Sequence, residues 1–498
     1  MRKRIYSIIA VLLILSFTFA AGMKAEDNSE PVLTKDSQLQ SKLLSVSENE
    51  VPETTVGDTG FGKKTVLRIW YTEEGMSPYI EQQAAKYMQE HEDIHILPVL
   101  VPQAEYLERI YDESVGKGEQ TGMPDLYLTT SDTLEKACLS GIATTILDND
   151  QQVGEEKFPL AALNAVTYKG KKVAYPLYYE TAFFLYNRTY LEQMAKAHND
   201  QLQDLQEGMA AQEAADAMET EGQAPADGEV YVEGPEESVK LTEVSADDLI
   251  PRKIEDILNL ANDYDAPEGM ENIFKWDVTD VFYNYFFAGS TINVGGECGD
   301  DRSLVNINNS DTIAAMEVYQ ALRQFFSIEA KDSDYETILR EFREGKTLFT
   351  IASTDVIAKL KAAKDAGEFQ AEYGITHMPD LNSTLTSRGL SVTTVVAING
   401  FGEKQQEADD FAAFLTCNGD AGLYEMTGHP SASYMADYED EKLKKAMSVY
   451  EKSIGLPKIM EASNFWMQLE ITMTGIWEGD DITEAVEKLQ QQMDSQVN

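Results

Sequence analysis

The chain has 498 residues, and its 86 acidic side chains outnumber 40 basic ones to give a formal net charge of −46. A surface of this charge repels a phosphate backbone, which excludes nucleic acid as a partner. The three cysteines, Cys138, Cys298 and Cys417, are too few and too far apart for a disulfide framework.

The N-terminus has the pattern of a secretory signal peptide. Basic residues at positions 2–4 precede an apolar run over residues 5–22, and small residues follow. We expect residues 1–25 to direct export, so that the protein is secreted or faces the outside of the cell membrane. No cysteine stands there to carry a lipid. An uncleaved N-terminal anchor is the alternative, because the apolar run approaches the ~17 residues of a short membrane span.

Residues 26–60 are polar and acidic, and we expect a disordered spacer there. The fold then begins near Thr65 with alternating strands and helices. Strands are expected over residues 66–70, 94–99 and 125–128, and helices over residues 78–90, 106–115 and 133–140. This alternation indicates a mostly parallel sheet flanked by helices.

Residues 172–191 combine β-branched and aromatic side chains with one carboxylate, that of Glu180. Because proline fixes φ and donates no hydrogen bond, Pro176 predicts two strands joined by a kink. The second strand is expected to end at Asn187. A carboxylate among aromatic rings needs a partner, so Glu180 either contacts a ligand or is paired in a buried site.

Residues 199–248 contain fifteen acidic residues and one basic residue. Alanine, glutamine, glycine and glutamate dominate the composition. This bias predicts an acidic low-complexity insertion that is disordered or loosely helical. Its simplest interpretation is a solvated surface segment without a specific function.

The second half of the chain is richer in helices. Two strands are expected, over residues 347–351 and 390–398. Helices are expected over residues 254–264, 278–287, 312–326, 335–344, 408–416, 441–453, 463–476 and 483–493. Outside the biased segments the chain is long enough for two domains of ~150 residues or more.

The segment His91-Glu92-Asp93-Ile94-His95 matches the H-E-x-x-H signature of zinc metallopeptidases. That site needs both histidines on one face of a single helix. Here the expected helix ends near residue 90 and a strand starts at residue 94, so His91 and His95 should diverge across a loop. A zinc peptidase using His91, Glu92 and His95 is therefore a remote alternative, and we expect no metal, cofactor or catalytic residue.

Aromatic and acidic side chains recur near the expected strand ends and in the later half of the chain. They are Trp70 and Glu74 after the first strand, Asp132 after the third, Tyr178 and Glu180 in the 172–191 stretch, and Trp276, Tyr283 and Trp466. Ligands of open α/β sheets bind beyond the carboxyl ends of strands. Aromatic faces combined with carboxylates suit sugar rings. Core packing explains each aromatic residue taken alone, so their joint placement is the signal.

Five short segments follow one another in a specific order: P-D-L to a glycine at 124–141, A-Y-P with a glutamate and Y-N-R at 172–188, F-R-E-G-K at 342–346, L-P-K to F-W at 456–466, and W-E-G at 477–485. In this order they resemble the extracellular solute-binding proteins of bacterial ABC importers, in the group that includes maltose- and maltodextrin-binding proteins. The similarity covers residues 65–493 apart from the acidic insertion. Each segment is weak alone, and the five in order are specific.

The resemblance implies roles for individual residues. Trp466 would stack on a sugar, Glu180 and Asp132 would accept hydrogen bonds from hydroxyls, and Trp70 would support the end of the first strand. The chain also departs from the family, because Ser353-Thr354-Asp355 replaces a G-P-W segment that carries a stacking tryptophan. The expected ligand is a carbohydrate, which this departure allows to differ from maltodextrin.

The expected fold is a two-lobed α/β fold like that of periplasmic binding proteins, with a mostly parallel sheet in each lobe. Lobe 1 is expected over residues 61–178 with 390–432, and lobe 2 over residues 179–389 with 433–498. The acidic insertion then belongs to lobe 2. Pro176 would lie near the hinge, and Glu180 would face the cleft.

The function expected from this fold is non-enzymatic. A monomer captures an oligosaccharide between its lobes, closes by hinge bending and delivers the sugar to the transmembrane subunits of an ABC permease. Capture of another polar solute, such as a polyamine, is the alternative, for which the acidic surface and Asp355 supply carboxylates. A surface receptor without a permease is a third interpretation.

Overall fold

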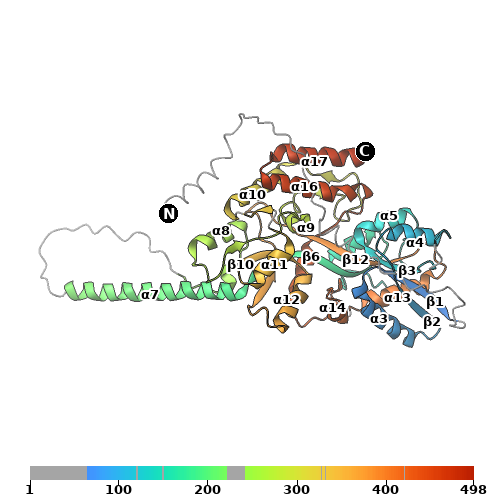
Figure 1. Ribbon diagram of the computed structural model, residues 1–498, viewed down its shortest axis with the longest axis horizontal. Coiled ribbons are helices and arrows are strands. Elements are labelled where there is room, and N and C mark those ends of the chain that lie inside the picture. The colour runs from blue at the N-terminus through green and yellow to red at the C-terminus, as the bar shows by residue number, and fades with distance from the viewer. Residues whose placement is uncertain are drawn as a thin grey trace. The chain divides into compact units, whose positions relative to one another are not determined.

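The computed structural model describes residues 64–118, 122–148, 151–220, 242–326, 328–330, 333–419 and 421–497. The expected signal peptide and spacer lie outside these residues, as do residues 221–241 of the acidic insertion. Within the described ranges the central sheet has nine strands in the order β2-β1-β3-β12-β6-β10-β7, with β11 paired to β6 and β13 paired to β12. Helices pack around this sheet (Figure 1).

The strands are β1 (Thr65–Tyr71), β2 (Ile94–Leu100), β3 (Leu126–Thr130), β4 (Thr167–Tyr168), β5 (Lys171–Lys172), β6 (Tyr175–Asn187), β7 (Asn272–Phe274), β8 (Asn293–Val294), β9 (Val305–Asn306), β10 (Thr347–Ser353), β11 (Tyr373–Thr376), β12 (Leu390–Ile398) and β13 (Ile454–Gly455). The helices are α3 (Ser77–Glu90), α4 (Tyr106–Ser114), α5 (Leu134–Leu139), α6 (Leu160–Val166), α7 (Arg188–Thr220), α8 (Ile254–Asp263), α9 (Val281–Asn284), α10 (Ser310–Phe326), α11 (Tyr335–Arg343), α12 (Asp355–Asp365), α13 (Gln405–Cys417), α14 (Gly422–Thr427), α15 (Glu441–Lys452), α16 (Phe465–Glu478) and α17 (Ile482–Val497).

The opening of the fold is the strand–helix–strand unit that the sequence predicts. β1 pairs in parallel with β2 and with β3. Helix α3 connects β1 to β2 and buries Tyr79, Ile80, Gln83, Ala84 and Tyr87, whose spacing is that of one helical face. Parallel strands require such a crossover, because a tight turn cannot join them.

The two histidines of the H-E-x-x-H segment lie on different elements. His91 follows the last residue of α3, with non-helical backbone angles, and His95 lies within β2. The predicted divergence across a helix-to-strand loop is confirmed. Among the described residues, no group of three or more histidine, cysteine, aspartate or glutamate side chains is arranged to hold a metal ion.

Residues 175–187 form one strand, β6, so the prediction of two strands joined by a kink at Pro176 is wrong. Pro176 pairs with Val395 and Tyr178 with Thr394, which leaves Leu177 without an opposite residue in β12. A bulge of this kind absorbs the hydrogen bond that proline cannot make. The main-chain oxygen of Leu177 accepts instead from the Ala432 N–H at 2.9 Å.

The first half of β6 and the second half have different partners. Residues 175–181 pair with β12, whereas residues 182–186 pair with β10 and residues 184–187 with β11. Because β12 also pairs with β3, β6 and β12 join the parallel strands β1 to β3 to the strands β7, β10 and β11. The sheet is therefore parallel at its ends and antiparallel around β6 and β12.

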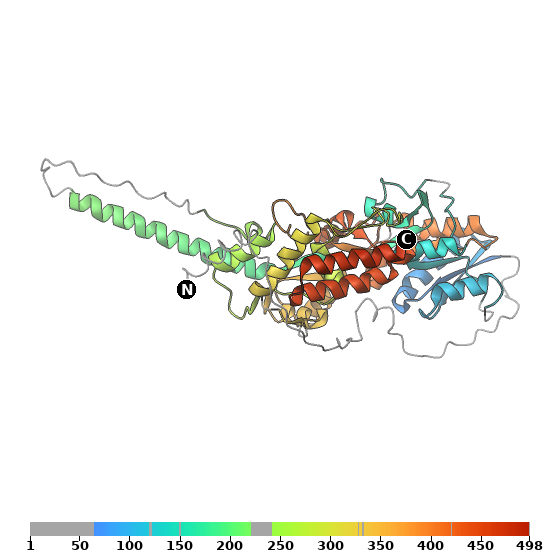
Figure 2. The same ribbon diagram turned by 90° about the horizontal axis from the view of Figure 1, so that it is seen from above.

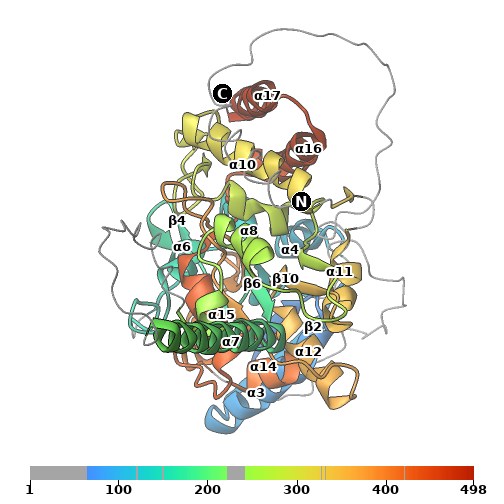
Figure 3. The same cartoon turned by 90° about the vertical axis from the view of Figure 1, so that its left-hand side faces the viewer.

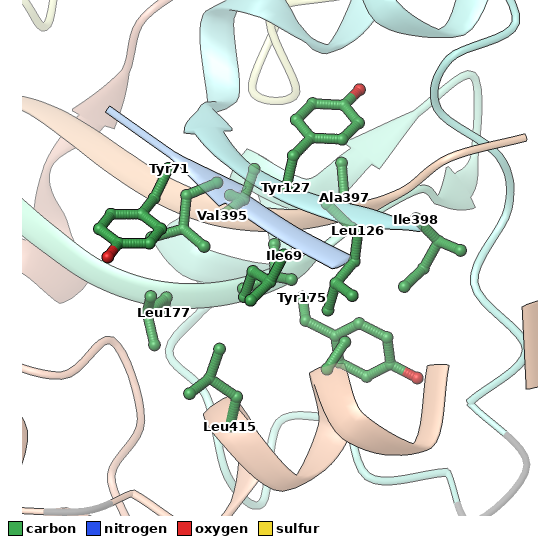
Figure 4. Packing of buried hydrophobic residues seen from close by; sticks show 14 of the residues in the cluster. Ile69, Tyr71, Leu126, Tyr127, Tyr175, Leu177, Val395, Ala397, Ile398 and Leu415 are labelled. Carbon is green, nitrogen blue, oxygen red and sulfur yellow. The ribbon is translucent and has the colours of Figure 1, made fainter. Parts of the chain in front are cut away.

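Two apolar cores flank this junction. The first joins β1, β3, the first half of β6, β12 and α13, and Figure 4 shows Ile69, Leu126, Tyr175, Val395 and Leu415 packed within it. The second is rich in aromatic rings: Phe184 lies 5.1 Å from Phe349, Phe274 lies 4.5 Å from Trp276, and Trp276 lies 5.4 Å from Trp477 between ring centroids. Helices α10, α16 and α17 lie together in this part of the molecule (Figure 3).

Part of the acidic insertion is a regular helix. The 33-residue α7 passes through residue 199, where the insertion was expected to begin, and continues to Thr220. At 1.5 Å per residue it spans about 50 Å, and its second part extends away from the sheet (Figure 2). Asn199 exchanges side-chain hydrogen bonds with the backbone of Val244, while Leu205 and Met209 are exposed. No helix in the described ranges is long and apolar enough to cross a membrane.

Candidate ligand-binding site

The strand register brings Asp132 and Glu180 to the same level of the sheet. Thr130 pairs with Thr394 across β3 and β12, and Val392 pairs with Glu180 across β12 and β6. Asp132 follows Thr130 by two residues, in the short 3-10 helix Ser131–Thr133. The 3-10 helix that carries Asp132 contacts β12, and Glu180 pairs with Val392 on the other edge of the same strand.

Asp355 approaches Glu180 from the other edge of β6. Ser353, the last residue of β10, pairs with Ala182. Asp355 lies two residues beyond Ser353, and Glu180 lies two residues before Ala182 on the antiparallel partner. The strand ends that precede Asp132 and Asp355, at Thr130 and Ser353, thus lie on strands that adjoin β12 and β6 near the segment of β6 that carries Glu180.

The carboxylate of Asp132 is poorly satisfied. Its Oδ1 atom is buried and accepts no hydrogen bond from any described residue. Burial raises the pKa of Asp132, while a hydrogen bond from Thr130 and the positive charge of Lys458 act in the opposite direction. An unpaired buried acceptor costs about 1–3 kcal/mol, so a donor from a ligand is favoured at this atom.

Trp466 lies on α16, and the short 3-10 helix Met460–Asn464 that precedes α16 begins beside Glu135. The residue that opens the preceding segment, Met460, donates its N–H to Glu135 at 2.7 Å, and Glu135 stands three positions after Asp132. The Trp466 side chain is partly exposed. Its ring packs edge-on against Tyr285, with centroids 5.4 Å apart. The Phe465 ring lies at 5.3 Å between centroids as well. A fixed, partly exposed indole is suited to stacking on a ligand.

Glu470 stands one helical turn after Trp466, and the sequence did not single it out. Burial raises the pKa of Glu470 to about 7, against the lowering effect of a hydrogen bond from the Val281 N–H, and the nearby charge of Asp277 raises it further. This carboxyl group is therefore close to half-protonated near neutral pH and can either donate or accept a hydrogen bond.

Asp355 is held in a network of its own. Its Oδ1 accepts from the Tyr335 hydroxyl at 3.0 Å and from the Ser353 hydroxyl, and its Oδ2 lies 2.9 Å from Lys359 Nζ. Tyr283 stacks on Tyr335 with ring centroids 4.8 Å apart. The structure thus brings Tyr283 and Asp355, both predicted site residues, into one cluster through Tyr335.

Tyr178 faces a second cluster near the end of β1. Its hydroxyl donates to Glu73 Oε2 at 2.9 Å, and its ring stacks on His429 with centroids 4.2 Å apart. His429 Nε2 lies 2.8 Å from Glu73 Oε1. Glu74, the predicted residue, is exposed beside Glu73. The contact between Glu73 and His429 spans 356 positions, so no local pattern predicts it.

Trp70 and Trp276 lie in the interior. Both have 0% of their surface exposed. Trp276 donates its indole N–H to Asn284 at 2.8 Å and packs on Phe274. In this structure neither indole offers surface to a ligand, and the contacts predicted for them remain predictions from the sequence. Core packing accounts for both rings here.

Comparison with known proteins identifies the family. The profile of the bacterial extracellular solute-binding proteins matches residues 82–446. A search of curated proteins found no match.

Solved structures with a similar fold include an extracellular solute-binding protein from Staphylococcus aureus in complex with maltose, with a TM-score of 0.64, 17% identity, and coverage of 87% of this chain and 98% of that chain. A cyclo/maltodextrin-binding protein complexed with maltotetraose follows, with a TM-score of 0.63, 16% identity, and coverage of 88% and 98%. The maltose-binding periplasmic protein from Listeria monocytogenes in complex with maltose has a TM-score of 0.61, 17% identity, and coverage of 87% and 97%.

Identities this low establish the fold, and the profile match establishes the family. The expected α/β fold and the family resemblance are both confirmed. The chain belongs to the bacterial extracellular solute-binding proteins.

Proposed function

We propose that this protein captures a carbohydrate outside the cell and delivers it to the transmembrane subunits of an ABC permease. The observation that carries the proposal is the shared fold. It extends over 97% to 98% of three proteins whose structures were determined with maltose or maltotetraose. We infer that the carboxylates and the aromatic ring gathered beside β6 form the solute site.

The chemistry of these side chains supports a polyhydroxylated ligand. Asp132 offers a buried acceptor that lacks a protein donor, and Glu180 lies at the same level of the sheet. Sugar hydroxyls donate to carboxylates, while the C–H face of a pyranose packs on an indole such as that of Trp466. The polar groups then fix orientation, and the ring supplies apolar contact area.

The proposed lobes are residues 61–178 with 390–432, and residues 179–389 with 433–498. In support, the first core draws on residues 67–179 and 395–432, with Tyr450 added from α15. The change of strand partners after Thr181 is where a hinge would act. Moving such a hinge from mostly open to mostly closed requires the solute to favour the closed form by about 5.5 kcal/mol.

A binding titration tests the proposal. We expect a saturable change in tryptophan fluorescence with at least one member of a panel of maltose, maltotriose and xylo- and cello-oligosaccharides. For the variants binding is measured by calorimetry: Trp466→Ala should weaken it by about 100-fold, and Trp466→Phe, which keeps an aromatic face, should retain part of the affinity. A folded protein that ignores the whole panel would overturn the carbohydrate assignment.

A polyamine is the second candidate solute. The observation that favours it is the gathering of Asp132, Glu180 and Asp355 in a chain of net charge −46. Melting temperatures measured with spermidine at constant ionic strength separate the two candidates. A rise with spermidine, absent with every glycan and lost in Glu180→Gln, would replace the sugar by a polyamine.

A further inference from the structure

A second pocket lies at the point where β6 exchanges one partner strand for another. β12 accompanies β6 as far as Thr181, and β11 joins it at Phe184. Ala182 lies between these two partners, and Gly389 approaches its main-chain oxygen closely. The ends of β11 and β12 diverge here and leave a pocket of about 470 Å³. This volume is sufficient for a small molecule.

The walls of this pocket come from Ala182 of β6 and from four further segments. They are the loop before α8, the residues at and after the end of β11, the loop before β12, and the last turns of α15. The polar side chains that these segments contribute include Arg252, His377, Asp380, Arg388 and Lys452. None of these five belongs to the candidate solute site of Asp132, Glu180, Asp355 and Trp466.

The acidic side chains of the pocket are already engaged. Asp247 Oδ1 lies 2.8 Å from Arg188 Nη1. Asp380 Oδ1 accepts a hydrogen bond from the Ser387 N–H at 3.0 Å. Arg388 makes two hydrogen bonds to Glu297, at 3.0 and 2.8 Å. Arg252 and Lys452 line the pocket and take part in none of the ion pairs between described residues. The charge of Arg252 acts on the carboxylate of Asp248, and its backbone N–H donates to Asp256 Oδ2 at 2.9 Å. Two cations therefore remain available at this pocket.

The pKa of His377 reflects the positive charges at the same pocket. Burial is the largest cause that lowers the pKa of His377 to about 4, and the charges of Lys452 and Lys445 lower it further. The imidazole is therefore neutral at physiological pH. Its Nε2 lies 3.2 Å from the Ser448 hydroxyl. A neutral imidazole beside Lys452 and Lys445 can donate a hydrogen bond to an anion and does not repel it.

We propose that this pocket is a second ligand site, selective for a small polyvalent anion, with Arg252 and Lys452 as its principal contacts. Hydrogen bonds from charged donors to phosphate or carboxylate oxygens are stronger than neutral ones. In a chain of net charge −46, long-range attraction cannot concentrate anions. The local cations must supply the affinity.

Isothermal titration of the full chain with inorganic phosphate and, separately, with citrate tests this site at constant ionic strength. The two probes distinguish a phosphate ligand from a polycarboxylate. We expect saturable binding of at least one probe to a single site. In the double variant Arg252→Gln/Lys452→Gln its affinity should fall at least about tenfold.

The matched control is Lys444→Gln. Lys444 lies on the same helix as Lys452 but pairs with Glu441 at 2.7 Å, and its removal changes the net charge by the same amount per residue. The Lys444→Gln variant should bind the probe with an affinity within about twofold of that of the unaltered chain. Both Arg252 and Lys452 are exposed, so the double variant should keep its melting temperature. Absence of saturable binding by both probes, or equal losses in the double variant and the control, would overturn the proposal.

Discussion

Two regions on the same stretch of β6 differ in charge. Around Glu180 the sheet gathers carboxylates, one with an oxygen that no described residue satisfies. Around Ala182, two residues further along, the pocket is lined by Arg252 and Lys452, which take part in no ion pair between described residues. Both regions lie near the point where β6 exchanges β12 for β11 as its partner.

The contrast shows that net charge is a poor guide to what a protein binds. A value of −46 excludes nucleic acid, yet it does not distinguish a site for a polyol from a site for an anion. The groups within a few ångströms of a ligand decide, because exposed charges beyond about 8–10 Å are screened in physiological salt. Variants on one side should therefore leave ligands of the other side unaffected.

The largest effect is expected from Trp466→Ala. Losing the indole face should weaken glycan binding by about 100-fold, equivalent to about 2.7 kcal/mol, because stacking area and enclosure are lost together. Phosphate binding, measured by titration of the same sample, should stay unchanged. A parallel loss of both ligands would mean that the two regions form one site.

Glu180→Gln should have an intermediate effect. The amide keeps the shape of the side chain but replaces a charged acceptor by a neutral one, so glycan affinity should fall about tenfold. Glu368→Gln is the control, because Glu368 pairs with Arg343 on the surface. Equal glycan affinity in both variants, measured by calorimetry, would remove Glu180 from the site.

Glu470 predicts a smaller dependence of stability on pH. Its folded-state pKa is raised to about 7, so the stability that it contributes is present at acidic pH and is lost as pH rises through 7. Glu470→Gln should therefore raise the melting temperature at pH 8 by about 2 °C and change it little at pH 4. The same shift at both pH values would contradict this assignment.

His377 predicts a dependence of stability on pH of the opposite sign, with the loss of stability at acidic pH. Its folded-state pKa is lowered to about 4, so the stability it contributes is present above pH 6.5 and is lost as pH falls towards 4. His377→Gln should raise the melting temperature at pH 5 by about 1 °C and leave it unchanged at pH 8. If the melting temperature of the variant differed from that of the unaltered chain by the same amount at pH 5 and at pH 8, the His377 ring would not be shielded from solvent.

Local pattern predicted the elements well where periodicity was strong. The strand over residues 390–398 has the expected bounds, and helix α3 starts one residue before its prediction. The α/β class and the family followed from the order of five segments. Alternation and helical spacing are properties of neighbouring residues, so they are present in the sequence itself.

Position-specific environments were less predictable. Pro176 indicated a kink, but the partner strand β12 absorbed the proline through a bulge. Composition predicted an acidic insertion that is disordered or loosely helical, and its residues 199–220 continue α7 as a regular helix. Among the four tryptophans, Trp70 and Trp276 are fully buried and Trp466 is partly exposed. All three look alike in the sequence, because burial depends on segments far away in the chain.

The sequence by itself thus determined the class of fold and the family, and it supplied the predictions of an export signal and of residues that recognise a polar solute. Only the tertiary structure decided which of those residues meet. The positions of Asp132 and Glu180 relative to each other depend on strand pairing across β3, β12 and β6. The contact of Glu73 with His429 joins residues 356 positions apart. The basic pocket has the same origin, since register and strand exchange are set by long-range packing that no local window of sequence contains.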